Sequence, residues 1–182
     1  SGFDFNLSNL IKDKNLGRVV DGTTGSAQIG VTVSRAGDVN KDGFDDFIIG
    51  APYWNSNQGK VILVFGKPRT QAISPLFLNN LSSGVAIEII GEATNNDFGS
   101  SMSSGDFNND GFGDILICAH TASSNTGKTY MIFGHNGTWP SSISAINVGS
   151  TIAGVKFTGS STSQSVSNAG DVNKDGIDDI II

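Results

Sequence analysis

The sequence predicts an all-β protein built from the repeated, four-stranded antiparallel blades of a β-propeller. The first observation is a repeat, because a nine-residue motif recurs after 68 and then 65 residues, a period typical of repeat architectures. The second is that each period contains four segments of strand length. The third is composition: 24 glycines among many Ser, Thr and Asn residues suit turns and short strands, and no stretch has useful helical periodicity.

The four segments of each unit differ in character. The first is small and polar, as expected where backbones crowd together. The second is a continuous apolar run, which predicts burial on both faces. The fourth alternates roughly between apolar and polar residues, which predicts a half-exposed edge. We expect first strands at 31–34, 100–103 and 165–167, and second strands at 47–50, 115–119 and from 180 onward. Third strands are expected at 60–65 and 128–133, and fourth strands at 17–20, 86–90 and 155–157.

The motif between the first and second strands has the pattern of a calcium loop. Its copies, 38–46, 106–114 and 171–179, carry oxygen-bearing side chains at positions 1, 3, 5 and 9 and Gly at position 6. Ca²⁺ takes about six to eight oxygens, and a short loop can supply them from alternate residues if the backbone turns sharply at the glycine. Acidic surface turns are the plain alternative. Three copies with the same oxygen positions favour three Ca²⁺ sites.

Position 7 of each loop could add only its backbone carbonyl. The predicted ligands are Asp38, Asn40, Asp42, Phe44, Asp46, Asp106, Asn108, Asp110, Phe112, Asp114, Asp171, Asn173, Asp175, Ile177 and Asp179. These loops are not EF-hands, which need a bidentate Glu at position 12. Isoleucine stands there in every copy, so the ligand set must close at position 9 and the loop must lead into a strand.

Further landmarks connect the motif to a known family. Phe65-Gly66 recurs as Phe133-Gly134, and Gly50-Ala51-Pro52 follows the first loop. Together with Asp-x-Asn-x-Asp-Gly-x-x-Asp, they resemble the FG-GAP repeats of integrin α-subunit propellers and their bacterial and protist relatives. The second unit departs from Gly-Ala-Pro with Cys118-Ala119-His120. The resemblance implies that each loop joins the innermost strand of a blade to the next one outward. It also implies bound Ca²⁺, an extracellular or cell-surface location and a role in adhesion or recognition.

The chain then divides into a linker with the outer strand of a preceding blade (1–22), FG-GAP repeat 1 (23–91), repeat 2 (92–159) and a partial repeat 3 (160–182). This amounts to about 2.5–3 blades, an incomplete propeller segment by comparison with the roughly seven blades that the resemblance implies. Open strand edges at both ends would favour association. We therefore expect further blades, from the same polypeptide or from other copies, to complete the fold, and expect residues 1–182 alone to aggregate or oligomerise.

Charge and cysteine content narrow the range of possible functions. The formal net charge is −6, and eleven of the seventeen acidic residues lie in the three loops, so three Ca²⁺ ions would neutralise it. No basic stripe exists to bind nucleic acid, and no apolar run is long enough to insert into a membrane. The lone Cys118 is predicted to be a buried small apolar residue. Possible glycosylation sequons begin at Asn6, Asn80 and Asn136.

Signals for catalysis are weak. Residues 122–129 fit a loose phosphate-binding pattern, but a strand follows where a helix is required, which favours a hairpin turn. Cys118 and His120 could share a strand face, yet nothing would lower the pKa of the thiol. Tyr53, Trp54 and Trp139 lie in loops, where they could anchor a ligand, although packing between blades is the plainer interpretation.

The sequence therefore predicts a non-enzymatic, Ca²⁺-binding propeller segment of an extracellular adhesion or recognition protein, with a protein or glycan ligand. Two alternatives remain open. One is a structural subunit of an extracellular fibre or surface layer built from such repeats. The other is a propeller appendage of a secreted hydrolase.

Overall fold

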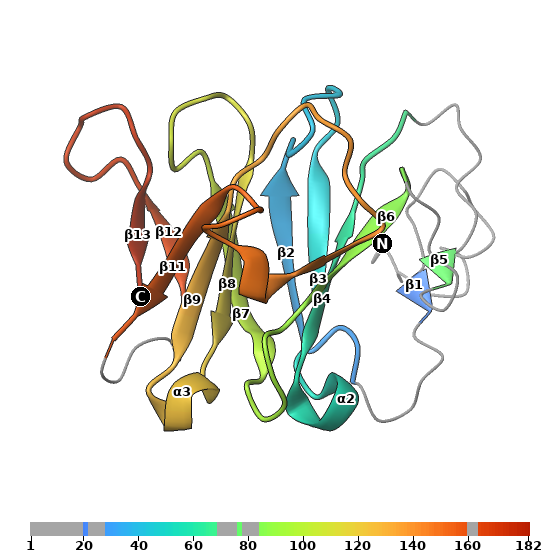
Figure 1. The fold of residues 1–182 in the computed structure, drawn as a ribbon. Helices are drawn as coiled ribbons and strands as arrows, with labels where there is room; N and C mark the ends of the chain where they lie inside the picture. The colour runs from blue at the N-terminus through green and yellow to red at the C-terminus, as the bar shows by residue number, and fades with distance from the viewer. Residues whose placement is uncertain (1–19, 22–27, 69–75, 78–83, 160–163) are drawn as a thin grey trace, which may run out of the picture.

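The computed structural model describes residues 20–21, 28–68, 76–77, 84–159 and 164–182. Strands dominate these residues and form two large sheets and two small ones. The sheets stand side by side, and the three motif loops lie together at one end of the strands (Figure 1). The short turns α2 (Trp54–Asn57) and α3 (Ala122–Asn125) lie at the opposite end. This is an all-β arrangement of separate blades, as predicted.

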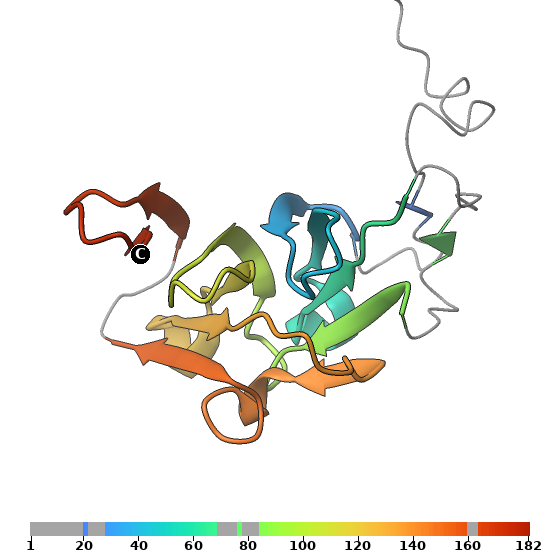
Figure 2. The same cartoon turned by 90° about the horizontal axis from the view of Figure 1, so that it is seen from above.

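The first blade contains β2 (Thr32–Gly37), β3 (Asp46–Ala51), β4 (Lys60–Val64) and β6 (Ala86–Ile90), paired antiparallel in that order. The second contains β7 (Phe98–Gly105), β8 (Asp114–Ala119), β9 (Lys128–Ile132) and β11 (Gly154–Thr158) in the same order. The hairpin of β12 (Ser167–Gly170) and β13 (Asp179–Ile181) begins a third blade. The segment is thus an incomplete β-propeller, and the three blades are seen along their strands in Figure 2.

The outer edge of the first blade differs from the prediction. Instead of a half-exposed edge strand, β6 is mostly buried, because β10 (Ser142–Ser144) pairs parallel with it as a fifth strand. This segment comes from the connection between β9 and β11, so the second repeat supplies it. β1 (Val20–Asp21) and β5 (Leu76–Phe77) also pair parallel. The predicted strand at 17–20 lies outside the described residues except for Val20.

Each turn between the second and third strands is left-handed. Asn55, Ser56 and Asn57 in α2 all have positive φ, as do Ser123, Ser124 and Asn125 in α3. Such backbone is costly for residues other than Gly. In the first blade its carbonyls accept amides of the connection to the second, for example Asn95 N to Ser56 O at 3.0 Å. The loose phosphate-binding pattern at 122–129 therefore forms a tight turn that leads into β9, as expected from the strand that follows it.

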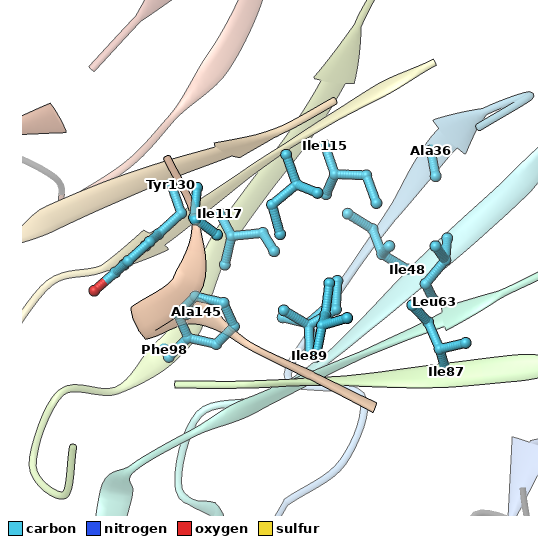
Figure 3. Close-up of a cluster of buried hydrophobic side chains, with 14 of the residues drawn as sticks. Ala36, Ile48, Leu63, Ile87, Ile89, Phe98, Ile115, Ile117, Tyr130 and Ala145 are labelled. Atoms are coloured by element: carbon cyan, nitrogen blue, oxygen red, sulfur yellow. The ribbon is translucent and has the colours of Figure 1, made fainter. Parts of the chain in front are cut away.

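The main core lies between the first two blades. Neighbouring side chains of β3 show why its apolar run is continuous: Ile48 faces the second blade, whereas Ile49 packs with Ile62 and Val64 on the opposite face. The cluster between the blades is drawn in Figure 3. Its members include Ile48, Leu63, Ile87, Ile89, Phe98, Ile115, Ile117, Tyr130 and Ala145, all fully buried.

Aromatic residues close this core at the loop end. Trp139 is 8% exposed, packs with its ring centre 6.1 Å from that of Phe65 of the first blade, and stacks on His135. Its predicted role in packing between blades is therefore confirmed. Tyr53 is exposed instead, and Trp54 is half-buried beneath the Lys60 ammonium. Burial of the His135 ring also lowers its pKa.

Candidate metal centres

Each motif loop joins the innermost strand of a blade to the next strand outward, as the resemblance implied. The loops connect β2 to β3, β7 to β8 and β12 to β13. Position 6 is a glycine with positive φ in every copy: 91° at Gly43, 81° at Gly111 and 90° at Gly176. A side chain built on Gly43 or Gly176 would meet nothing within 4 Å, so the conformation of the backbone, rather than space, requires glycine there.

The side-chain oxygens of positions 1 and 3 converge. The Asp42 amide donates to Asp38 Oδ1 at 3.0 Å and to Asn40 Oδ1 at 3.1 Å, so two oxygens share one donor. The same pairs of distances are 3.1 and 3.1 Å around Asp110, and 3.0 and 2.8 Å around Asp175. Because an oxygen keeps a second lone pair after accepting one hydrogen bond, these oxygens could also coordinate a cation.

The remaining oxygens of positions 1 and 5 shape the loop. In the first copy, Asp38 Oδ2 accepts the amide of Gly43 and Asp42 Oδ1 accepts that of Phe44. Both bonds recur in the second and third copies. The side chains of positions 1 and 5 therefore curl toward the loop backbone instead of extending into solvent. Three separate segments adopt one hydrogen-bonded arrangement, which is what the repeated pattern predicts.

Position 9 is buried in the first two loops. Asp46 is 2% exposed and Asp114 is fully buried. Each carboxylate accepts two backbone amides: Asp46 from Val39 and Gly66, Asp114 from Phe107 and Gly134. Burial raises the pKa of each to about 6, although the amide bonds act in the opposite direction. In the third loop, Asp179 accepts the Val172 amide and, at 3.4 Å, the side-chain amide of Asn173.

The glycine of each Phe-Gly pair donates a hydrogen bond to the position 9 carboxylate, a contact that the sequence-based prediction did not include. Gly66 and Gly134 donate to position 9 of their own repeats at 2.7 and 3.0 Å. A Cβ on Gly66 would overlap the Asp45 carbonyl oxygen, and one on Gly134 would overlap that of Gly113. A signal was present in the sequence, because each glycine follows position 9 by 20 residues.

The chemistry of the loops suits a hard cation. They offer carboxylate and amide oxygens, the donors that Ca²⁺ prefers. Among the described residues, however, no three Asp, Glu, His or Cys side chains gather as a ready-made metal cluster. Position 3 is an asparagine, and both oxygens of position 9 face backbone amides in the first two loops. Positions 1, 3 and 5 thus form the preorganised part of each candidate site, and position 9 is buried in the first two loops.

The rival nucleophile pair is not supported. Cys118 is buried and packs with Leu116, Met131 and Val166 in the apolar cluster on the far face of the second blade. His120 Nε2 instead lies 3.5 Å from Asp97 Oδ2, in the turn after β8. The two side chains therefore lie in different surroundings, the thiol in an apolar cluster and the imidazole beside a carboxylate.

Comparison with known proteins agrees with this architecture. The FG-GAP repeat profile matches residues 30–64 and 98–130, each spanning a motif loop and its flanking strands. Integrin alpha-8 of Mus musculus is 40% identical over 53 residues, which are 29% of this chain and only 5% of the integrin. Two segments of the chain thus match the FG-GAP repeat, and 53 of its residues resemble part of an integrin α-subunit.

Proposed function

We propose that this chain is a non-enzymatic, Ca²⁺-stabilised β-propeller segment of an extracellular adhesion or recognition protein, with one Ca²⁺ in each of its three motif loops. The observation that carries the proposal is the shared position 5 amide, which draws the oxygens of positions 1 and 3 together in every copy. The FG-GAP matches and the partial likeness to integrin alpha-8 support it.

Bound Ca²⁺ would reduce the electrostatic repulsion among the aspartates of each loop. Each loop carries at least three aspartates within nine residues, and without a cation their mutual repulsion disfavours the folded loop. A cation that binds only the folded state stabilises by mass action, by about 2.7 kcal/mol per site at a hundredfold excess over its Kd. Millimolar extracellular Ca²⁺ would suit sites of modest affinity.

The test is thermal unfolding of the full chain with millimolar Ca²⁺ and with a chelator. We expect Ca²⁺ to raise the Tm, and we expect Asp42→Ala to remove part of that increase because position 5 of the first loop is lost. Asp45→Asn is the matched control: Asp45 lies in the same loop, but its side chain is exposed and paired with Arg35 at 2.7 Å. A Tm that does not respond to Ca²⁺ would refute the proposal.

The proposed extracellular setting can be tested at a glycosylation sequon. Asn136, in the sequon Asn136-Gly137-Thr138, lies on an exposed bend of the second repeat. None of the described helices is long and apolar enough to cross a membrane. We expect expression through a secretory pathway to add a glycan at Asn136, which a mass difference lost in Thr138→Ala and retained in Thr138→Ser would establish. The sequons at Asn6 and Asn80 lie outside the described residues.

A further inference from the structure

The first motif loop is attached to the second blade. The Gly113 amide donates to Asp38 O at 3.0 Å, and the His135 amide donates to Val39 O at 2.9 Å. Asp38 and Val39 are positions 1 and 2 of the first loop, and Gly113 is position 8 of the second. A Cβ on Gly113 would overlap the Ala36 carbonyl oxygen, so the glycine permits the close approach. The backbone of the first loop is thereby hydrogen-bonded directly to that of the second.

Lys41 extends this contact to the predicted ligands. Its ammonium donates to Asp110 O at 3.4 Å and lies 4.6 Å from the centre of the Phe112 ring. Asp110 and Phe112 are positions 5 and 7 of the second loop, which would contribute a carboxylate and a backbone carbonyl to its cation. The side chain of one motif loop thus touches two residues of the next that are predicted to supply ligands, one of them in a cation–π geometry.

Position 4 of each motif loop has positive φ. Lys41 occupies position 4 with a φ of 57°, in the left-handed region that lysine seldom adopts. Asn109 holds the same position in the second loop with a φ of 56°, and asparagine accepts that conformation more readily. Lys174 in the third loop shares this conformation with a φ of 62°, so the positive φ belongs to position 4, and what distinguishes Lys41 is its contact with the second loop.

We propose that Lys41 is a positioning residue that couples the first two metal loops, so that a cation in the first raises the affinity of the second. The inference rests on the proposed function. A cation in the first loop would fix the backbone that carries Lys41, and Lys41 would then hold Asp110 and Phe112 in place. The second loop would lose less conformational freedom on binding its own cation, which is positive cooperativity without a large structural change. The charge of Lys41 opposes this effect, but it is exposed and screened by solvent and salt.

The test is a Ca²⁺ titration of the full chain followed by NMR, with the Gly43 and Gly111 amides reporting the first and second loops. The affinity of the second loop is measured with the first loop intact and with it disabled by Asp42→Ala. The ratio of the two affinities is the coupling factor. We expect it to be about fivefold or more, to fall to about one in Lys41→Asn, and to persist in Lys41→Arg. Lys174→Asn is the matched control, because Lys174 has the same loop position and a φ of 62°.

A coupling factor that Lys41→Asn leaves unchanged would overturn the inference, and so would a factor below one, which would mean that the lysine only repels the cation. Hydrogen exchange in chelator provides a readout without metal. We expect residues 106–114 to exchange faster in Lys41→Asn than in Lys174→Asn, and equal rates would show that Lys41 does not order the loop. Absence of Ca²⁺ binding in every variant would overturn the proposed function and the coupling together.

Discussion

Gly66 and Gly134 connect the third strand of each blade to its motif loop, and neither can carry a side chain without moving that loop. The Gly66 amide reaches buried Asp46, and a Cβ on Gly66 would overlap the Asp45 carbonyl oxygen. The Phe-Gly landmark of the sequence thus has a physical cause. Its glycine is selected by close approach to the neighbouring loop, whereas the glycine at position 6 is selected by positive φ.

Substitution of Gly66 should therefore destabilise the fold even where the backbone would accept alanine. We expect Gly66→Ala to lower the free energy of unfolding by about 1–3 kcal/mol, the usual cost of overpacking a tight site. Gly84→Asn is the control, because Gly84 has a φ of 81°, which asparagine tolerates, and a side chain there would meet no atom within 4 Å of its Cβ. Urea unfolding in chelator would measure both, and equal small losses would contradict the steric argument.

Glu92 forms salt bridges that link the connection before β7 to β9 and β11. It lies in the connection between β6 and β7, and its carboxylate receives Lys128 of β9 at 2.5 Å and Lys156 of β11 at 2.8 Å. Burial alone would raise the pKa of Glu92, but the hydrogen bonds from the two lysines outweigh it and hold the pKa below its ordinary value of 4.5. A depressed folded-state pKa adds stability that is present above the unfolded value and lost as pH falls through the folded one.

The stability difference between wild type and Glu92→Gln should depend on pH accordingly. We expect wild type to be the more stable protein at pH 7 and the difference to shrink as pH falls below 4.5, because protonation removes the charge that both lysines need. All other carboxylates are common to the two proteins, so their titration cancels. Urea unfolding between pH 3 and pH 7 measures the difference. A gap that stays constant over this range would show that the lysine pairings contribute nothing.

At the scale of elements, β10 protects the edge of a blade to which it does not belong in sequence. Ile143 of β10 is 6% exposed and packs in the core between the blades, whereas nearby Ile146 is 58% exposed. We expect Ile143→Ala to cost about 2–5 kcal/mol, as for other buried isoleucines, and to promote association through the uncovered edge of β6. Ile146→Ala should have almost no effect. Chemical unfolding and light scattering would test this, and similar behaviour of the two variants would contradict it.

The second, third and fourth strands of the blades were predictable, because their apolar runs and the turns between them define them. The polar first strands were placed less well: β2 ends at residue 37 and β12 at residue 170, each three residues beyond the predicted limits of 31–34 and 165–167. β6 lies at 86–90 as predicted, and β3, β4, β8 and β9 begin or end within one residue of their predicted limits. β10 was missed because Ser142-Ile143-Ser144 is too short to show periodicity, and its partner comes from the preceding repeat. The left-handed turns were missed because Asn and Ser favour many kinds of turn.

Among the predicted metal ligands, the arrangement of some could also be predicted from the sequence, whereas that of others depends on distant residues. Positions 1, 3 and 5 adopt their shared arrangement through bonds to amides within the loop, so sequence spacing alone could indicate it. The burial of Asp46 and Asp114 depends on Gly66 and Gly134, contacts that no local pattern describes. Lys41 was overlooked because its partners lie 69 and 71 residues away in the next repeat.

At the scale of the whole molecule, the two complete blades share one core. Ile48, Leu63 and Ile87 of the first pack in the same cluster as Ile115 and Ile117 of the second. Neither blade can therefore expose its inner face without exposing that of its neighbour. This arrangement favours a single cooperative unfolding transition in place of two independent ones.

Removal of a buried side chain from the second blade should therefore lower the stability of the first blade as well. In a Trp139→Phe background, which leaves Trp54 as the single tryptophan, we expect Ile117→Ala to lower the urea midpoint read from Trp54 fluorescence by as much as the midpoint read from far-UV circular dichroism. Trp54 lies in the first blade and Ile117 is fully buried in the second, so only coupled unfolding produces this agreement. A Trp54 midpoint that stays at the wild-type value would demonstrate independent blades.

The parallel pairing of β10 with β6 determines where segments of this chain can be exchanged with those of a homologue without separating the strands of one blade. A gene segment that encodes one sequence repeat does not encode one complete blade, because the strand that closes the first blade follows β9 in the second repeat. Exchange of the second repeat for that of a homologue would also replace the outermost strand of the first blade. Successful recombination, by evolution or by design, must therefore keep Ser142–Ser144 compatible with β6, or cut the chain within blades and not between repeats.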